Sequence, residues 1–281
     1  LGLTACGGNG DAEAIPEDQT SFRIGVANLH EGHRQLEEIA EEELGYEIEL
    51  VNFTDYNQPN PALTNGDLDA NWFQHIAFLA EHNVASGDNL QPLGATESVP
   101  LTLYSDEYDD VEDFADGDEI AIPNDPVNQG RAINVLVAAG LVELAEESAQ
   151  PEPRHVDEEA STVVLNPVDA AQTVNALESL AGSVINNNFA QDADLDPLNE
   201  GIFSDDPADP AAFPYINAFV VTEDNVDNEA LQEIAAVYHD DRVLEIMEER
   251  SNGTSVPASD VTAEELTESL NDYEETLQSA D

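Results

Sequence analysis

Lysine is absent from this chain, and its six basic residues, all arginine, stand against 62 aspartate and glutamate residues. The formal net charge is −56 at pH 7. A protein this negative repels phosphate backbones and anionic lipid surfaces over its whole surface. The composition therefore excludes nucleic acid as a partner and excludes electrostatic attachment to a membrane.

The chain also lacks any apolar run as long as the roughly 18 residues that a membrane-spanning helix requires. No repeat with a period of about 20 to 50 residues is visible either. Apolar residues nevertheless make up 41% of the sequence and gather in periodic runs such as 133–144 and 215–221, so a disordered polyanion is not expected. We predict a folded chain of one large or two medium domains with a halophilic, acidic surface adapted to concentrated salt.

Cysteine occurs once, as Cys6, in the segment Leu3-Thr4-Ala5-Cys6. This segment resembles the lipobox at which a bacterial lipoprotein signal is cut and the cysteine is acylated, with palmitate as an expected acyl group. Residues 1–20 are then a lipobox remnant and flexible tether. The protein is accordingly expected to be lipid-anchored to the cell membrane and to face outside the cytoplasm, at a cell surface or in a periplasm. The alternative is an ordinary free thiol.

Signatures of catalysis and of metal binding are missing as well. There is no Gly-x-Ser-x-Gly motif, no phosphate-binding loop and no candidate cysteine nucleophile apart from Cys6. His30 and His33 are three residues apart, whereas a zinc-binding helix needs its second histidine at the fourth position, which Arg34 occupies. We therefore expect a binding protein without metal or cofactor rather than an enzyme.

Hydrophobic periodicity indicates an α/β protein. Strand, helix and strand patterns follow one another twice, which is typical of parallel α/β units and suggests two lobes. The predicted strands cover 22–27, 46–53, 119–122, 162–166 and 183–186, and the predicted helices cover 33–44, 128–139, 228–253 and 261–277.

Residues 53–79 have the composition of a binding pocket. Two prolines suit the first turn of a short helix and Gly66 suits its end, after which a period-2 pattern predicts a strand from Leu68. The aromatic candidates in this segment are Tyr56, Trp72, Phe73 and His75. Because no pair of nucleophile and base accompanies them, we expect these side chains to bind a ligand.

Arg131 is a candidate for binding an anion. It follows 128–130 and is predicted to lie in the first turn of a helix, where free N–H groups and the helix dipole attract negative charge. An arginine fork at this place would hold a carboxylate through two hydrogen bonds. The alternative, equally compatible with the spacing, is a surface arginine that pairs with one of the many carboxylates.

Several motifs occur together in one order along the chain. They are Phe-Thr-Asp-Tyr (53–56), Pro-Asn-x-Ala-Leu (59–63), Gly-Asp-Leu-Asp-Ala-Asn-x-Phe-Gln-His (66–75), Pro-Asn-Asp-Pro-x-Asn-x-Gly-Arg (123–131), Val-Ile-Asn (184–186), Gly-Ile-Phe (201–203) and Pro-Tyr-Ile-Asn (214–217). With them the chain resembles the NlpA-type methionine-binding lipoproteins, the substrate-binding proteins of methionine ABC importers.

The resemblance implies an α/β, two-lobed periplasmic-binding-protein fold of type II with a ligand cleft between the lobes. It places 21–103 plus 222–281 in the first lobe and 104–221 in the second, with chain crossings near 99–105 and 218–223. By motif, the ligand-binding residues are Tyr56, Phe73, His75, Arg131, Asn186 and Asn217, and Trp72 and Asn128 are possible pocket residues. Arg131 is expected to hold the ligand carboxylate, the two asparagines 186 and 217 the charged ends of an amino acid, and the aromatic residues its side chain.

The resemblance also implies the function and the partners. The expected function is to capture methionine, as the L or D isomer, outside the cytoplasm and to deliver it to an ABC permease and ATPase complex. The segment 27–33 and the extra residues at 205–212 depart from the family pattern. Because of these departures, a methionine-containing dipeptide or another apolar amino acid stays open as the ligand. An enzyme or a surface adhesin built on the same fold is the alternative from another class of protein.

The charge leads to a prediction about stability. At about 1 M salt the Debye length falls to roughly 3 Å, which screens the repulsion among the surface carboxylates. We expect the melting temperature to rise steeply as salt is raised from dilute buffer, and a thermal melting series against salt concentration measures this. A melting temperature that is independent of salt would contradict the salt-adapted surface.

Overall fold

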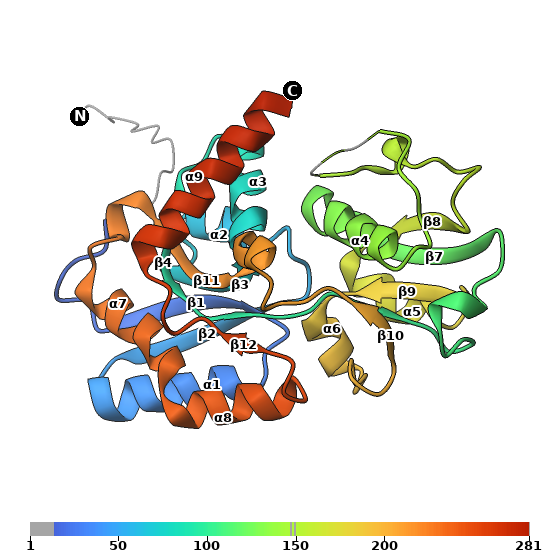
Figure 1. Cartoon of the computed structure of the whole chain (residues 1–281). Helices are drawn as coiled ribbons and strands as arrows, with labels where there is room; N and C mark the ends of the chain where they lie inside the picture. Colours follow the sequence, from blue (N-terminus) through green and yellow to red (C-terminus); the bar gives the residue numbers. More distant parts are fainter. Residues whose placement is uncertain (1–13, 147, 149, 281) are drawn as a thin grey trace, which may run out of the picture.

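The computed structural model describes residues 14–146, 148 and 150–280, which form two α/β lobes joined by two crossings of the chain (Figure 1). Each lobe is built around its own five-stranded sheet. The predicted two-lobed architecture is therefore confirmed. Cys6 and the proposed lipobox lie outside the described residues.

The sheet of the first lobe has the strand order β2-β1-β3-β11-β4. Its strands are β1 (Ser21–Ala27), β2 (Glu47–Phe53), β3 (Ala70–His75), β4 (Leu90–Ala95) and β11 (Asn217–Thr222). β1 pairs in parallel with β2 and β3, whereas β11 returns from the second lobe and pairs antiparallel with β3 and β4. The strand β11 therefore completes the sheet between β3 and β4, although it is far from both in sequence.

Helices cover both faces of this sheet (Figure 1). One core lies under α1 (Glu31–Ile39), α7 (Glu229–Ala236) and α8 (Asp241–Arg250), and the other under α2 (Pro59–Thr64), α3 (Ile76–Ser86) and α9 (Ala263–Ala280). Short β5 (Glu97–Ser98) and β12 (Val256–Pro257) pair beside the first crossing. None of the helices described is both long and apolar enough to span a bilayer.

The second lobe has a sheet of order β10-β6-β9-β7-β8. Its strands are β6 (Thr102–Tyr104), β7 (Asp118–Pro123), β8 (Val163–Val168), β9 (Gly182–Ile185) and β10 (Gly201–Ser204), and its helices are α4 (Pro126–Ala138), α5 (Thr173–Ala176) and α6 (Asn187–Asp192). The apolar side of α4 packs on this sheet and forms the main core of the lobe. Both α4 and α6 begin at the edge that faces the first lobe, which places their first residues beside the cleft.

The predicted strands are all present to within one or two residues, and the helix boundaries follow their caps. α1 begins at Glu31 because Nδ1 of His30 accepts a hydrogen bond from the Gly32 amide at 3.1 Å. A π-helical segment, Ala40–Leu44, continues it to Gly45, whose φ of +80° suits glycine. The predicted helix 228–253 is divided into α7 and α8 by a short 3₁₀ turn.

The structure places the two boundaries of the lobes differently from the prediction, the first by two residues and the second by a whole strand. The predicted second lobe, 104–221, includes most of β11, yet β11 lies between β3 and β4 in the sheet of the first lobe. The second crossing is therefore the segment 205–216, and the first crossing is 99–101, before β6. The pattern of β11 predicts only a buried strand, and its partners across the sheet decide to which lobe it belongs.

The expected tether also ends earlier than residue 20. The backbone N–H of Ile15 donates to Oδ1 of Asn225 at 2.8 Å, and the Ile15 side chain packs against the core under α1. Gln19 donates to Oδ1 of Asp69 at 3.1 Å. From Ile15 onward the chain is therefore part of the first lobe.

Two leucines of the second lobe, one buried and one exposed, allow a test of the assigned hydrophobic core. Leu103 on β6 is fully buried, whereas Leu198 is 67% exposed. We expect Leu103→Ala to lower the free energy of unfolding by about 2–5 kcal/mol, because it leaves a cavity, and Leu198→Ala to change it by less than about 0.5 kcal/mol. Chemical denaturation at high salt measures both, and equal effects would contradict the assigned core.

Candidate functional site

A cavity of about 100 Å³ lies between the lobes and is lined by residues of both. A single water needs roughly 10–15 Å³, so the cavity is large enough for more than one water. All eight residues predicted for the site line it, namely Tyr56, Trp72, Phe73, His75, Asn128, Arg131, Asn186 and Asn217. The structure thus brings the predicted residues together, and their roles toward a ligand remain predictions.

Strand ends and helix starts position these side chains. β3 ends at His75, and β11 begins at Asn217, directly opposite His75 in the antiparallel pair. From the second lobe, Asn128 lies in the first turn of α4 and Asn186 is the residue before α6. The cavity is therefore formed where the ends of secondary-structure elements from the two lobes meet.

An aromatic wall forms one side of the cavity. The ring of Tyr56 lies 6.1 Å from Phe73, 6.0 Å from Phe78 and 5.2 Å from Phe189, between ring centroids. Phe73 and Phe78 form an edge-to-face pair at 5.8 Å. Such a wall provides apolar, polarizable contact for a ligand side chain.

The amide of Asn128 connects the lobes. Its Oδ1 accepts from Nδ2 of Asn186 at 3.0 Å and lies 3.3 Å from Nε2 of His75. Since Nδ1 of His75 accepts the backbone N–H of Phe78 at 3.1 Å, the neutral ring carries its proton on Nε2 and donates to Asn128. Burial, with a smaller effect from Arg131, lowers the pKa of His75 to about 3, so this ring is neutral at pH 7.

A second contact between the lobes comes from Tyr56. Its hydroxyl donates to Oδ1 of Asn188, and burial raises the pKa of Tyr56 so that it stays a phenol. Two atoms in the cavity wall, Oδ1 of Asn186 and Nδ2 of Asn188, are buried without a hydrogen-bond partner among the described residues. The second lobe therefore offers one free acceptor and one free donor beside the cavity.

Arg131 pairs with a carboxylate of the protein and also lines the cavity. α4 begins at Pro126 and is capped by Asp125, so Arg131 lies in the second turn and not in the predicted first turn. Its Nε and Nη2 bind the Asp205 carboxylate at 2.6 and 3.1 Å, and Nη2 also donates to the Val99 carbonyl at 2.8 Å. The guanidinium lies over the Tyr215 ring at 4.3 Å.

This arrangement leaves part of the guanidinium for the cavity. The side chain of Arg131 is only 5% exposed, and the hydrogen bonds of the described residues involve Nε and Nη2 but not Nη1. Asp205 and Val99 belong to the two crossings, so Arg131 also ties both crossings to α4. An arginine that pairs with a carboxylate and still lines the cavity was not foreseen, because the pairing depends on the tertiary position of 205.

Trp72 is mainly a core residue. It is 5% exposed, stacks on Phe219 with centroids 5.0 Å apart and meets Tyr238 edge-on at 5.3 Å. Its edge reaches the cavity beside His33, whose ring is 4.5 Å away. It can therefore report on events in the cavity while stabilising the first lobe.

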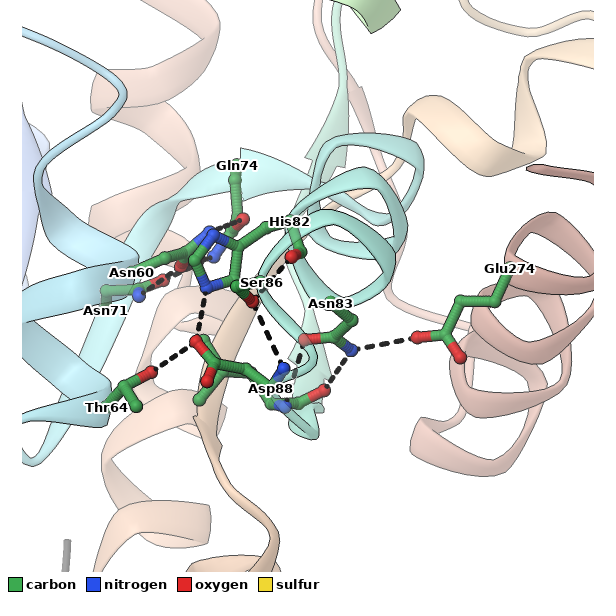
Figure 2. A network of polar contacts seen from close by, with 10 residues as sticks. Asn60, Thr64, Asn71, Gln74, His82, Asn83, Ser86, Asp88 and Glu274 are labelled. Carbon is green, nitrogen blue, oxygen red and sulfur yellow. Dashed lines mark hydrogen bonds and ion pairs between the residues drawn. The ribbon is translucent and has the colours of Figure 1, made fainter. Parts of the chain in front are cut away.

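Behind the aromatic wall lies a closed set of three buried amides, shown in Figure 2. Oδ1 of Asn60 accepts from Asn71 at 2.9 Å and from Gln74 at 2.6 Å, while Nδ2 of Asn60 donates back to Gln74 at 2.8 Å. Gln74 also donates to Asn71 at 2.9 Å. The amides fasten α2 to β3 and so fix the loop that carries Tyr56 against the strand that carries Phe73 and His75.

Several cavity residues were not predicted from the sequence. They are His30, His33, Phe78, Glu97, Asn187, Asn188, Gln191 and Met247, with the crossing 99–101. His30 and His33 stack with centroids 3.7 Å apart, and burial lowers the pKa of both, that of His30 to about 3. Phe78 and the asparagines near 186 stand close to a recognised motif. His30 and His33 were considered only as a metal motif and 99–101 only as part of a crossing, and Glu97 and Met247 had no local signal. The described residues contain no cluster of three or more histidine, cysteine or acidic side chains that could hold a metal ion.

The model of the NlpA lipoprotein family matches residues 23–259, which is most of the chain. The chain belongs to the NlpA lipoprotein family. This NlpA protein is 33% identical over 263 residues to the D-methionine-binding lipoprotein MetQ of Salmonella typhi, with 91% of this chain and 94% of the relative covered.

Solved structures of the family agree with the architecture. The substrate-binding protein of a methionine transporter from Streptococcus pneumoniae matches with a TM-score of 0.78 and 31% identity, covering 85% of this chain and 96% of that one. A nutrient-binding protein from Burkholderia cenocepacia, bound to methionine, matches with a TM-score of 0.79 and 28% identity, covering 84% and 99%. These relatives of the NlpA protein are substrate-binding proteins with the two-lobed fold.

The buried His75 predicts a pH dependence of stability. The pKa of His75 is about 3 in the folded protein and about 6.5 in the unfolded chain. Below pH 6.5 the unfolded chain binds a proton that the folded protein does not bind, so the free energy of unfolding decreases as the pH falls from 6.5 toward 3. The total loss is on the order of 5 kcal/mol, or about 1.4 kcal/mol per pH unit. His75→Asn, which keeps a capping oxygen for α3, should flatten the curve of unfolding free energy against pH between 6 and 4 by about this slope. Parallel curves for the two proteins would contradict the assignment.

Proposed function

We propose that this protein is a lipid-anchored substrate-binding protein that captures methionine outside the cytoplasm and delivers it to an ABC importer. The observation that carries the proposal is the cavity between the lobes, which combines an aromatic wall with a buried arginine and several asparagines. A zwitterion that leaves water needs a fixed partner for each charge, and a thioether needs soft apolar contact. The resemblance of the motifs and the named relatives support the same ligand.

Each group of the ligand has a proposed partner. Nη1 of Arg131 binds the carboxylate, and Asn186 and Asn217 bind the carboxylate and ammonium ends. The methylthioethyl side chain packs against Tyr56, Phe73 and His75. Because His75 is neutral and Tyr56 is protonated, this part of the cavity carries no charge that would oppose an apolar side chain.

The proposed role is transport and not catalysis. The residues of the cavity include no serine or cysteine nucleophile, and the buried histidines are held neutral by their surroundings. Acylation of Cys6 would attach the chain to the outer side of the membrane, and the closed lobes would present the ligand to the permease. Methionine in either the L or the D form fits this role.

A longer or more polar ligand is the second candidate. The cavity extends past the aromatic wall to His30 and His33, in the segment that departs from the family pattern. A methionine-containing dipeptide or a different apolar amino acid would place further groups toward this end. These ligands belong in the same titration series as methionine.

The first experiment is a calorimetric and fluorescence titration of refolded protein with L-methionine at high salt, with Trp72 as the reporter. We expect saturable binding that Arg131→Lys weakens by more than about tenfold, because a lysine cannot replace the guanidinium fork toward Asp205 and the ligand together. Arg34→Lys is the matched control, since Arg34 is exposed and pairs with Glu37 on α1.

Binding of a methionine-containing dipeptide with no response to methionine would replace methionine by the second candidate. If Arg131→Lys and Arg34→Lys bind as tightly as the unchanged protein, the proposed role of Arg131 is wrong.

A further inference from the structure

One ion pair joins the two lobes directly. Arg250, the last residue of α8 in the first lobe, donates from Nη2 to Oδ1 of Asp192, the last residue of α6 in the second lobe. Arg23, Arg34, Arg154 and Arg242 pair with carboxylates of their own lobe, and Arg131 pairs with Asp205 of the second crossing. Within the described residues, Arg250 is therefore the arginine that connects one lobe to the other.

Both partners lie one helical turn from the cavity. Met247, three residues before Arg250 on α8, lines the cavity from the first lobe. Asn188, four residues before Asp192 on α6, lines it from the second lobe. Residues three or four apart share a helix face, so the pair lies at the rim of the cavity, where the two lobes meet.

The pair is shielded from solvent on the arginine side. The side chain of Arg250 is 20% exposed, and its Nε is buried without a hydrogen-bond acceptor among the described residues. Its charge contributes, after burial, to the lowered pKa of His30 and His33 in the cavity wall. A partly buried pair of this kind is less screened by salt than a pair on the open surface.

Bringing the two lobes together costs electrostatic free energy, which the Arg250–Asp192 ion pair offsets. The formal net charge is −56, and acidic residues outnumber arginines in both lobes, so bringing the lobes together moves like charges closer. The hydrogen bonds from Tyr56 to Asn188 and from His75 to Asn128 join neutral groups and do not reduce this repulsion. Arg250 places a cation at the interface of the lobes, beside the Asp192 carboxylate.

We propose that Arg250 and Asp192 form an interlobe latch, a pair of positioning residues that hold the lobes closed around the ligand and slow its release. Opening of the lobes separates the two charges, so the latch acts on dissociation of the ligand. Association starts from the open lobes and does not involve the pair. The inference rests on the proposed function only in the choice of methionine as the probe.

Stopped-flow kinetics with L-methionine test the latch, with Trp72 as the reporter at about 1 M salt. We expect Arg250→Gln and Asp192→Asn each to raise the dissociation rate by roughly threefold to tenfold and to leave the association rate unchanged within about twofold. The double variant should release methionine no faster than either single variant, because the two substitutions remove the same interaction. Arg34→Gln, which removes an exposed pair within one lobe, should behave as the unchanged protein.

A charge exchange separates the latch from a general effect on folding. The double variant Arg250→Asp with Asp192→Arg should restore slow release, whereas Arg250→Asp alone should give the fastest release. Melting temperatures of the single neutral variants without methionine should lie close to that of the unchanged protein. Additive rate changes, or unchanged release in both single variants, would overturn the proposal.

A second measurement does not depend on the identity of the ligand. Small-angle X-ray scattering should give a larger radius of gyration for Arg250→Gln than for the unchanged protein and Arg34→Gln, because the lobes are more often open. If the unchanged protein does not bind L-methionine, the proposed ligand is wrong and the scattering comparison decides on the latch. Identical scattering of all three proteins would then reject it.

Discussion

The structure depends on closing two negatively charged lobes over a buried cavity. Each lobe is stabilised by its own apolar core, so the interface between them can be small and polar. The groups that meet across the cleft are amides, a neutral imidazole and a phenol, and Arg250 adds the one cationic contact seen between the described parts of the lobes. Hydrogen bonds between neutral groups let the two lobes touch without bringing further like charges together. The arginines then lie at the few places where a carboxylate needs a cation.

Two internal polar clusters set the geometry of the cleft. The amides of Asn60, Asn71 and Gln74 hold the aromatic wall in place, and every amide group in this set has a partner, so its burial is compensated. Arg131 and Asp205 connect α4 with both crossings of the chain. The same arginine therefore links the geometry of the crossings to the proposed carboxylate site, which would couple ligand binding to movement of the lobes.

Local pattern predicted most elements and the pocket segment. The period-2 run that ends at His75 became β3, and Gly66, predicted to end the short helix before it, follows α2 with a positive φ. The family motifs, with the aromatic segment for Trp72, led to all eight predicted cavity residues, because several of these motifs mark the end of a strand or the start of a helix at the cleft. The predicted lobe boundary differs from the structure at β11, since a buried strand has the same pattern whichever sheet it joins.

The sequence by itself determined the acidic character, the α/β elements and the aromatic segment that lines the cavity, because charge, periodicity and local composition are properties of short stretches of chain. Only the tertiary structure decided that Arg131 faces Asp205, that His30 and His33 reach the cavity and that Arg250 meets Asp192. The two ion pairs join residues 74 and 58 positions apart in the chain, and the place of the histidines depends on which face of a helix points to the cleft. Burial and pairing of such side chains follow from the packing of the lobes, which no short pattern contains.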